Sequence, residues 1–86
     1  MRVHFHRNFR RSYAKLPMKV RAQFKKRLKL FLESPFDPLL NNHALHGTWG
    51  QFRSINVTGD FRALFRMFGS DSVEFILIDR HGNLYE

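Results

Sequence analysis

The hydrophobic period of this chain changes partway along it, and that change limits the folds open to it. Up to residue 34, apolar side chains recur three or four positions apart, as they do on one face of an α-helix. From Phe52 onward they alternate with polar ones, as on a half-buried β-strand. A chain of 86 residues is long enough for one modest core. The sequence therefore predicts a single domain over residues 1–86, in which helices pack on a sheet as a two-layer α+β fold.

The first half begins with a short strand and a short helix. Val3 to His6 alternates apolar and polar residues and predicts the strand. Phe9, Tyr13 and Leu16 recur at i, i+4 and i+7 and mark the buried face of the helix. Pro17 ends this pattern, because proline disfavours the helical conformation in the residue before it.

A second helix is predicted from Pro17 to Glu33, since proline suits the first position of a helix. Its apolar residues form one stripe that we expect to face the core: Val20, Phe24, Leu28, Phe31 and Leu32. The run Ser34–Pro38 contains two prolines and ends the helix.

The second half predicts an antiparallel meander of three or four strands. Phe52 to Val57 and Phe61 to Phe68 alternate and are joined by a turn at Thr58-Gly59. A turn over residues 69–71 leads to the apolar strand Val73–Ile78. Two antiparallel helices can cover only one face of such a sheet, so the other face should be exposed to solvent or to a ligand.

The charge of the chain is concentrated in its first half. Residues 1–34 carry 11 Lys and Arg against one acid, whereas residues 35–86 carry 4 against 6, and the whole chain has a net charge of +8. A basic half of this kind is typical of proteins that bind a polyanion, although a solvated surface is the simpler interpretation. No apolar run approaches the ~20 residues that span a bilayer. With no cysteine and no secretory signal, we expect a cytoplasmic protein.

Several polar residues are placed so that the uncovered face could bring them together. Arg62 and Arg66 share one side of a strand, Asp60 begins that strand, His43 precedes the meander and His81 follows its last strand. Metal-free RNA cleavage needs a base for the 2′-OH, an acid for the leaving 5′ oxygen and cations on the phosphate. Histidine and arginine suit these roles. From spacing alone, a sheet that merely carries polar residues is the more common explanation.

Other residues also allow more than one interpretation. A zinc site built from His43, His46 and His81 is disfavoured, because residues three apart on a strand face opposite ways. Trp49 would either stack on a base or pack a loop against the core. Arg53 would either anchor a partner or form a cross-strand ion pair.

Two segments together resemble the YafQ-like branch of the RelE/StbE toxins, small bacterial toxins of type II toxin–antitoxin pairs. They are HALHGTW at residues 43–49 and FRSINVTGDFR at residues 52–62. The tail, with His81 and Tyr85 after an apolar strand, and the Leu-Pro and Pro-Phe-Asp-Pro breaks of the first half also match, so the resemblance covers nearly the whole chain.

The resemblance implies a microbial-RNase-like α+β fold and a metal-independent endoribonuclease, without a cofactor, that cleaves mRNA in the ribosomal A site. It assigns His43, Asp60 and His81 to catalytic positions and Arg62 to the phosphate. Asp60 would take the 2′ proton or hold His43 in the tautomer that does. An RNA-binding role is expected for a further set of residues: Arg53, Phe61, Arg66, Arg80 and Tyr85.

The sequence departs from YafQ in two places: Asn56 replaces a histidine, and an arginine near the end of the last strand is missing. Arg80 or Arg66 would take over its role. The expected partners are a cognate acidic antitoxin, mRNA and the ribosome, with no membrane, and the toxin alone should be a monomer. Ribosomal RNA would dock on four lysines of the second helix: Lys19, Lys25, Lys26 and Lys29. The alternative function is a non-catalytic basic module that binds RNA or an acidic protein.

Overall fold

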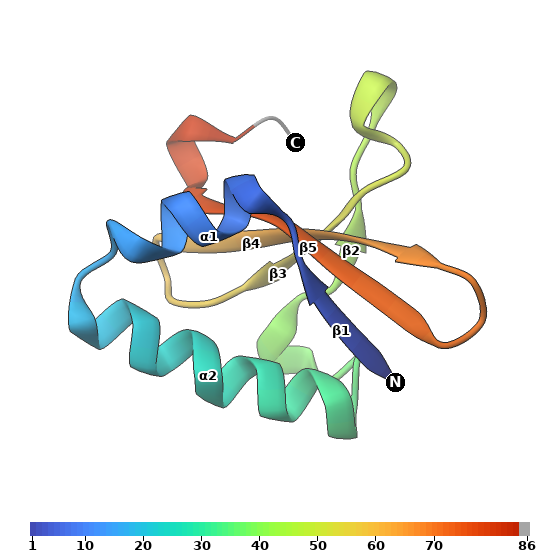
Figure 1. The fold of residues 1–86 in the computed structure, drawn as a ribbon, viewed down its shortest axis with the longest axis horizontal. Helices are drawn as coiled ribbons and strands as arrows, with labels where there is room; N and C mark the ends of the chain where they lie inside the picture. Colours follow the sequence, from blue (N-terminus) through green and yellow to red (C-terminus); the bar gives the residue numbers. More distant parts are fainter. Residues whose placement is uncertain (85–86) are drawn as a thin grey trace.

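A computed structural model describes residues 1–84 and confirms the predicted α+β class: two helices packed on a five-stranded mixed sheet (Figure 1). The elements, in chain order, are β1 (Arg2–Phe5), α1 (Arg7–Ala14), α2 (Met18–Glu33), β2 (His43–Ala44), β3 (Arg53–Asn56), β4 (Phe61–Phe68) and β5 (Ser72–Arg80). Short 3₁₀ turns lie at Pro38–Leu40, Gly47–Trp49 and His81–Asn83. Tyr85, which the sequence suggested for RNA binding, lies outside the described residues.

The sheet has the strand order β1-β5-β4-β3-β2. The strands from β2 to β5 form the predicted antiparallel meander, and it has four strands. The first strand pairs in parallel with the last, so that Val3 lies level with Val73. The first and last strands of the chain therefore meet at one edge of the sheet.

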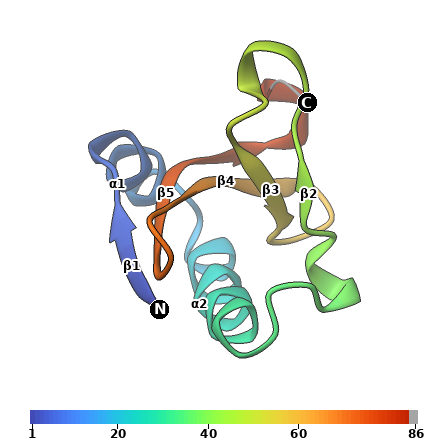
Figure 2. The same cartoon turned by 90° about the vertical axis from the view of Figure 1, so that its right-hand side faces the viewer.

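The core is built largely from phenylalanine rings. Phe75, in the middle of β5, is fully buried, and its ring packs on rings from β1, α1, α2 and β4: Phe5, Phe9, Phe24, Phe31 and Phe65. Figure 2 shows α2 below the sheet, with α1 on the β1 side. The hydroxyl of Ser12 in α1 accepts a hydrogen bond of 3.2 Å from the N–H of Ile78. This bond gives the β5 backbone a partner beyond the end of β1.

Two details of the helices differ from the sequence prediction. Leu16 is buried as expected, but α1 ends at Ala14, so Leu16 reaches the core from the turn before α2. Leu32 was assigned to the buried stripe of α2, and that assignment is wrong, because its side chain is 43% exposed. Successive residues of a helix are about 100° apart, so Leu32 points well away from the buried Phe31.

The sheet face opposite the helices, here called the open face, is less exposed than expected. Ser54 and Leu64 are register partners on this face and both are buried, as is Leu45 in the segment that joins β2 to β3. This segment folds back on the sheet through a hydrogen bond of 3.0 Å from the Leu45 N–H to the Phe52 carbonyl. The middle of the open face is therefore buried, and the end next to the turn at residues 58–60 is here called its polar end.

Candidate functional site

The polar end of the open face contains a row of three side chains. Asn56, Arg62 and Asp79 are register partners on β3, β4 and β5. A β-bulge in β5 produces this row. The hairpin pairs Phe65 with Phe75 but Leu64 with Leu77, so one extra residue, Ile76, enters β5 between them.

The bulge decides which side chain of β5 stands beside Arg62. Without the extra residue, the ladder would place Ile78 opposite Arg62 and would turn Asp79 to the other face. The run from Phe75 to Ile78 is apolar throughout, so the alternation in the sequence does not show where the extra residue lies. For that reason Asp79 could not be identified as a site residue from the sequence.

Arg62 is held by the turn that precedes it. Its Nη1 donates hydrogen bonds to the carbonyls of Thr58 and Gly59, at 3.1 and 3.2 Å, and to that of its neighbour Phe61 at 3.3 Å. These bonds fix the guanidinium by one nitrogen. Among residues 1–84, no acceptor bonds to Nε or Nη2 of Arg62. These two nitrogens form the edge of the guanidinium that can donate to two oxygens of one phosphate.

A second group lies at the rim, where β4 begins and β5 ends. Asp60 forms an ion pair with Arg80, whose guanidinium also lies over the ring of Phe61, 4.9 Å from its centroid. The N–H of His81 donates a hydrogen bond of 2.7 Å to the carbonyl of Asp60. The structure thus brings Asp60, Arg80 and His81 together at the rim, next to the row that contains Arg62.

His43 lies on the same face but two strands away from Arg62. Its Cα pairs with that of Ser54, and its Nδ1 is 2.8 Å from the carbonyl oxygen of Asn41. A carbonyl can only accept, so in the neutral ring Nδ1 carries the proton and Nε2 carries the lone pair. Asn41 adopts a left-handed backbone conformation with φ of 46°, which asparagine tolerates better than most residues.

The carbonyl of Asn41 therefore orients His43, a role that the sequence suggested for Asp60. Asp60 is four residues along the chain from Leu64, which is level with His43, and this places it about 13 Å away along the strands. It is paired with Arg80. Asp60 was expected either to take the 2′ proton or to hold His43 in the required tautomer. Its position does not suit the second role.

Two of the expected RNA-binding residues, Arg53 and Arg66, lie apart from this site, and a third, Phe61, is buried beneath Arg80. Arg53 is on the helix side of the sheet, where its Nε donates a 2.8 Å hydrogen bond to Asn42 Oδ1 and its guanidinium lies 5.5 Å from the ring centroid of Phe36. Phe61 is 7% exposed and belongs to the core. Arg66 is on the open face, but about 13 Å from Arg62 along β4, and it forms a 2.9 Å ion pair with Glu74. Of the two arginines proposed to replace the missing one, only Arg80 is near the site.

Trp49 and Asn56 are the two remaining residues that the sequence singled out. Trp49 is half-buried, and its ring lies 5.5 Å from that of Phe52 in the same segment, which favours loop packing over base stacking. Asn56, which stands where YafQ has a histidine, has a buried Oδ1 with no hydrogen-bond partner among the described residues.

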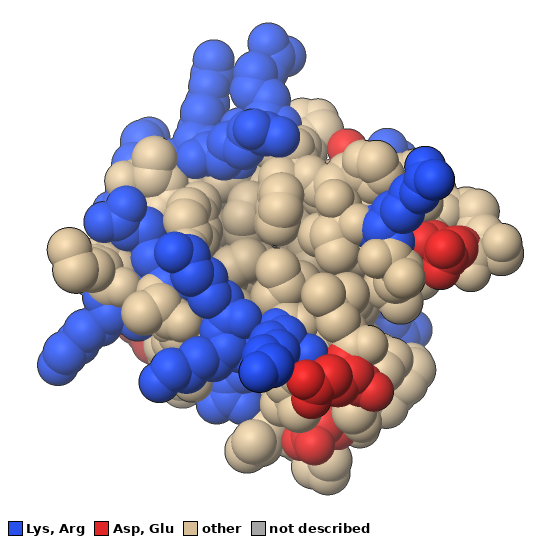
Figure 3. Space-filling view, turned by 60° about the horizontal axis from the view of Figure 1, so that its bottom comes forward, with Lys and Arg blue, Asp and Glu red and all other residues tan. Residues whose placement is uncertain are grey.

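The helix side of the molecule carries most of the positive charge. The four lysines of α2 are exposed: Lys19, Lys25, Lys26 and Lys29. Figure 3 shows basic side chains gathered in a band over α2 and in a second group over α1, with uncharged surface between them. No helix within residues 1–84 is long and apolar enough to cross a membrane. In the same part of the chain, no three His, Asp or Glu side chains are grouped so that they could hold a metal ion.

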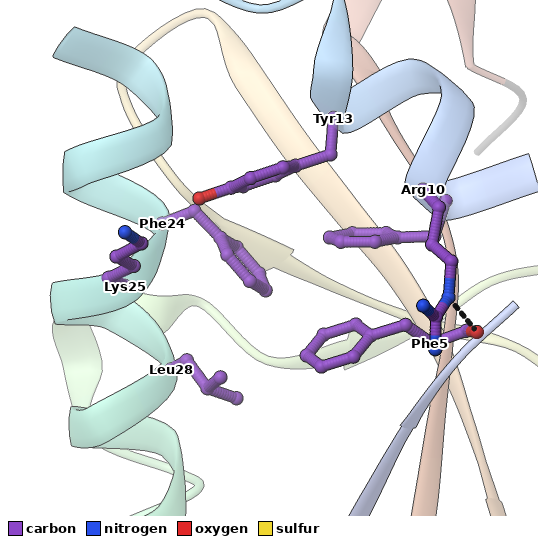
Figure 4. A pocket seen from close by; sticks show the side chains of 7 residues that line it. Phe5, Arg10, Tyr13, Phe24, Lys25 and Leu28 are labelled. Carbon is purple, nitrogen blue, oxygen red and sulfur yellow. Dashed lines mark hydrogen bonds between the residues drawn. The ribbon is translucent and has the colours of Figure 1, made fainter. Parts of the chain in front are cut away.

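A groove with a volume of about 330 Å³ lies between the two basic groups. Figure 4 shows Tyr13 reaching from α1 toward Phe24 of α2, with Leu28 below them and Phe5 of β1 opposite. Arg10 and Lys25 line its edges, and Arg10 Nε donates a 3.2 Å hydrogen bond to the carbonyl of Phe5. The groove is thus apolar inside and basic at its margins.

Comparison with solved structures shows what this architecture resembles. A YoeB/ParE toxin from Agrobacterium tumefaciens matches 94% of this chain and 99% of its own, at 19% identity with a TM-score of 0.80. YafQ from E. coli matches the full length of both chains, at 17% identity with a TM-score of 0.79. The archaeal RelE–RelB complex from Pyrococcus horikoshii matches 96% of this chain and 97% of the other, at 18% identity with a TM-score of 0.74. No protein-family model and no curated protein sequence matches the chain.

The chain therefore has the fold of the RelE/YafQ-like toxins over nearly its whole length. This agrees with the fold implied by the sequence resemblance. At identities of 17–19% the likeness shows the fold alone, and the activity must be argued from the residues of the site.

Proposed function

We propose that this protein is the toxin of a type II toxin–antitoxin pair and acts as an endoribonuclease that cleaves mRNA in the ribosomal A site without a metal ion. The observation that carries the proposal is that Arg62 lies at the polar end of the open face beside the rim group of Asp60, Arg80 and His81, with His43 two strands away on the same face. This set contains a base, an acid and two cations, which are the groups that RNA cleavage through its own 2′-OH requires.

In the proposed reaction, Nε2 of His43 takes the proton of the 2′-OH, because Nδ1 already donates to the Asn41 carbonyl. The 2′ oxygen attacks phosphorus, and the bond from phosphorus to the 5′ oxygen breaks. His81, on the exposed turn after β5, gives its proton to that leaving oxygen. Arg62 holds a non-bridging oxygen of the phosphate, while Asp60 positions Arg80 for the other. The products are a 2′,3′-cyclic phosphate and a 5′-hydroxyl.

The proposed partner that restrains this activity is an acidic antitoxin. The groove between α1 and α2 suits an amphipathic segment of such a protein, because the groove is apolar inside and Arg10 and Lys25 line its edges. Apolar side chains of the segment would pack on Phe24 and Leu28, and its carboxylates would meet the two cations. A segment that folds as it binds would cover the lysines of α2 as well.

The decisive experiment uses ribosomes programmed with a synthetic mRNA. We expect the purified protein to cleave the A-site codon and to leave a 2′,3′-cyclic phosphate, and we expect excess EDTA to leave cleavage of a model RNA intact. Replacement of the 2′-OH at the cleavage site by hydrogen should abolish the reaction, since the nucleophile is then absent. Tight RNA binding with no cleavage of the all-ribose mRNA would favour the non-catalytic module instead. Cleavage of the 2′-deoxy substrate at the same bond would exclude the mechanism.

A further inference from the structure

A second groove lies on the other side of α1, against the end of β5. Its volume is about 620 Å³, and α1, the turn after it and the last residues of β5 line it. It exists because β1 ends at Phe5 and pairs with β5 only as far as Phe75. Beyond that point α1 lies beside β5, joined to it by the bond between Ser12 Oγ and the Ile78 N–H.

Three cations line this groove. Arg11 lies in the last turn of α1 and Lys15 directly follows the helix, four residues on, so their side chains lie on one side of it, and both residues are exposed. Arg80 faces them from the end of β5. Asp79 is the one carboxylate among the described residues of the lining, and its Oδ1 already accepts from the Arg80 N–H at 2.7 Å and from Asn83 Nδ2 at 3.2 Å. The groove therefore keeps an excess of positive charge.

The rest of the lining is largely apolar. Leu16, Phe61 and Ile78 are buried at the bottom, while Pro17 and Leu77 complete the walls. Such a surface suits the flat face of a base or a ribose, and the cations at the rim suit a phosphate. One nucleotide has both parts.

The groove borders the candidate site. Asp79 and Arg80 line the groove, Asp79 is the register partner of Arg62, and Arg80 is paired with Asp60. An RNA strand held at Arg62 would thus place its next nucleotide over the end of β5.

We propose that this groove is a nucleotide subsite that holds the residue of RNA next to the scissile bond. Arg11 and Lys15 bind its phosphate, and its base or ribose packs on Leu16, Pro17 and Leu77. The inference rests on the proposed function and deepens it. Arg11 and Lys15 were not among the residues predicted to bind RNA, and both lie outside the lysine patch of α2.

The test combines a change in the protein with a change in the RNA. The probe is a short RNA with a 2′-deoxy residue at the cleavage site, so that it cannot be cut, and with one flanking phosphate at a time replaced by a neutral methylphosphonate. We expect the wild type to lose about tenfold in affinity at one flanking position, as for the loss of a charge-assisted hydrogen bond. The variant Arg11→Gln/Lys15→Gln should bind the intact RNA about tenfold more weakly than the wild type does. Neutralising the same linkage in the RNA should then weaken the binding of this variant little further. Fluorescence anisotropy measures both.

The matched control is Arg2→Gln/Arg7→Gln, which removes the same charge from exposed residues outside the groove. It should retain the wild-type sensitivity to the neutral linkage. Lys15→Arg, which keeps the charge, should bind the intact RNA as the wild type does. Circular dichroism verifies that each variant is folded.

Coupling between the two changes supports the subsite, and fully additive losses overturn it. Equal weakening of an acidic peptide of the same charge would also overturn it, in favour of a protein site. Cleavage of programmed mRNA by the wild type is measured separately. If cleavage occurs without coupling, the subsite fails and the proposed function stands. If coupling occurs without cleavage, the groove binds RNA and the endoribonuclease proposal fails.

Discussion

The two faces of the sheet differ in what holds them together. On the helix side, Phe75 and the rings around it form the main apolar cluster and provide the burial on which the fold depends. On the open face, the polar end is held by individual hydrogen bonds and ion pairs, such as those of Arg62 with the turn and of Asp60 with Arg80. The apolar cluster that stabilises the fold and the row that contains Arg62 thus lie on opposite faces of the sheet.

The strand β5 belongs to both regions, and its bulge at Ile76 sets the face on which each later side chain lies. Before the bulge, β5 contributes Val73 and Phe75 to the core. After it, the strand ends in Asp79 and Arg80, next to the candidate site. A change in one region should therefore leave the other largely intact, and this separation can be tested by mutation.

The largest expected effect is the loss of activity in His81→Ala. Removal of a general acid typically costs ~10²–10⁴-fold in rate. Because His81 is exposed, the midpoint of thermal unfolding should change little. Cleavage of programmed mRNA and circular dichroism measure the two quantities. A variant that remains fully toxic in cells would remove His81 from the mechanism.

The converse effect is expected for Phe75→Ala on the helix side. The side chain is fully buried among five other rings, so truncation should lower the free energy of unfolding by about 3–5 kcal/mol. Any molecules that remain folded should cleave at the normal rate. Denaturant titration gives the stability, and Phe75→Leu is the milder control. A loss below about 1 kcal/mol would contradict the assignment of Phe75 to the centre of the core.

An intermediate effect is expected for Arg62, which contributes both to the proposed activity and to the stability of the turn. Arg62→Ala removes a phosphate ligand, and comparable losses of one transition-state donor cost about 10²–10³-fold in rate. It also removes the side-chain donor from the carbonyls of Thr58 and Gly59, so a loss of stability of about 1 kcal/mol should accompany it. Arg62→Lys should restore the charge but not the two-donor geometry, and its rate should lie between those of the wild type and Arg62→Ala. Equal rates for lysine and arginine would argue against bidentate binding.

The smallest effect should come from the lysines of α2. Lys26→Glu/Lys29→Glu should weaken ribosome binding and lower the slope of log K against log salt by about 1 for each phosphate that is no longer neutralised. Arg2→Glu/Arg7→Glu changes the net charge by the same amount, but at the start of the chain. It should leave the slope closer to that of the wild type. The slope is measured by ribosome pelleting at several salt concentrations. Identical slopes for the two variants would show that only net charge matters.

Local sequence was enough to place the elements and the sides on which most of their residues lie. The helical period, Leu16-Pro17 and the alternation of Phe61–Phe68 each depend on residues only a few positions apart. For that reason the order of elements, the layer arrangement and the shared face of Arg62 and Arg66 could be predicted. The resemblance to the toxins rested on the same local motifs.

Which distant residues meet could be learned only from the complete fold. The pairing of Val3 with Val73, the bulge that sets Asp79 opposite Arg62, and the Asn41 carbonyl that orients His43 all depend on how the chain closes on itself. The same is true of Phe61, which faces the core, and of Arg53, which packs on Phe36. A hydrophobic pattern records whether a side chain is buried, but not its partners, because those are set by the register and packing of the complete sheet.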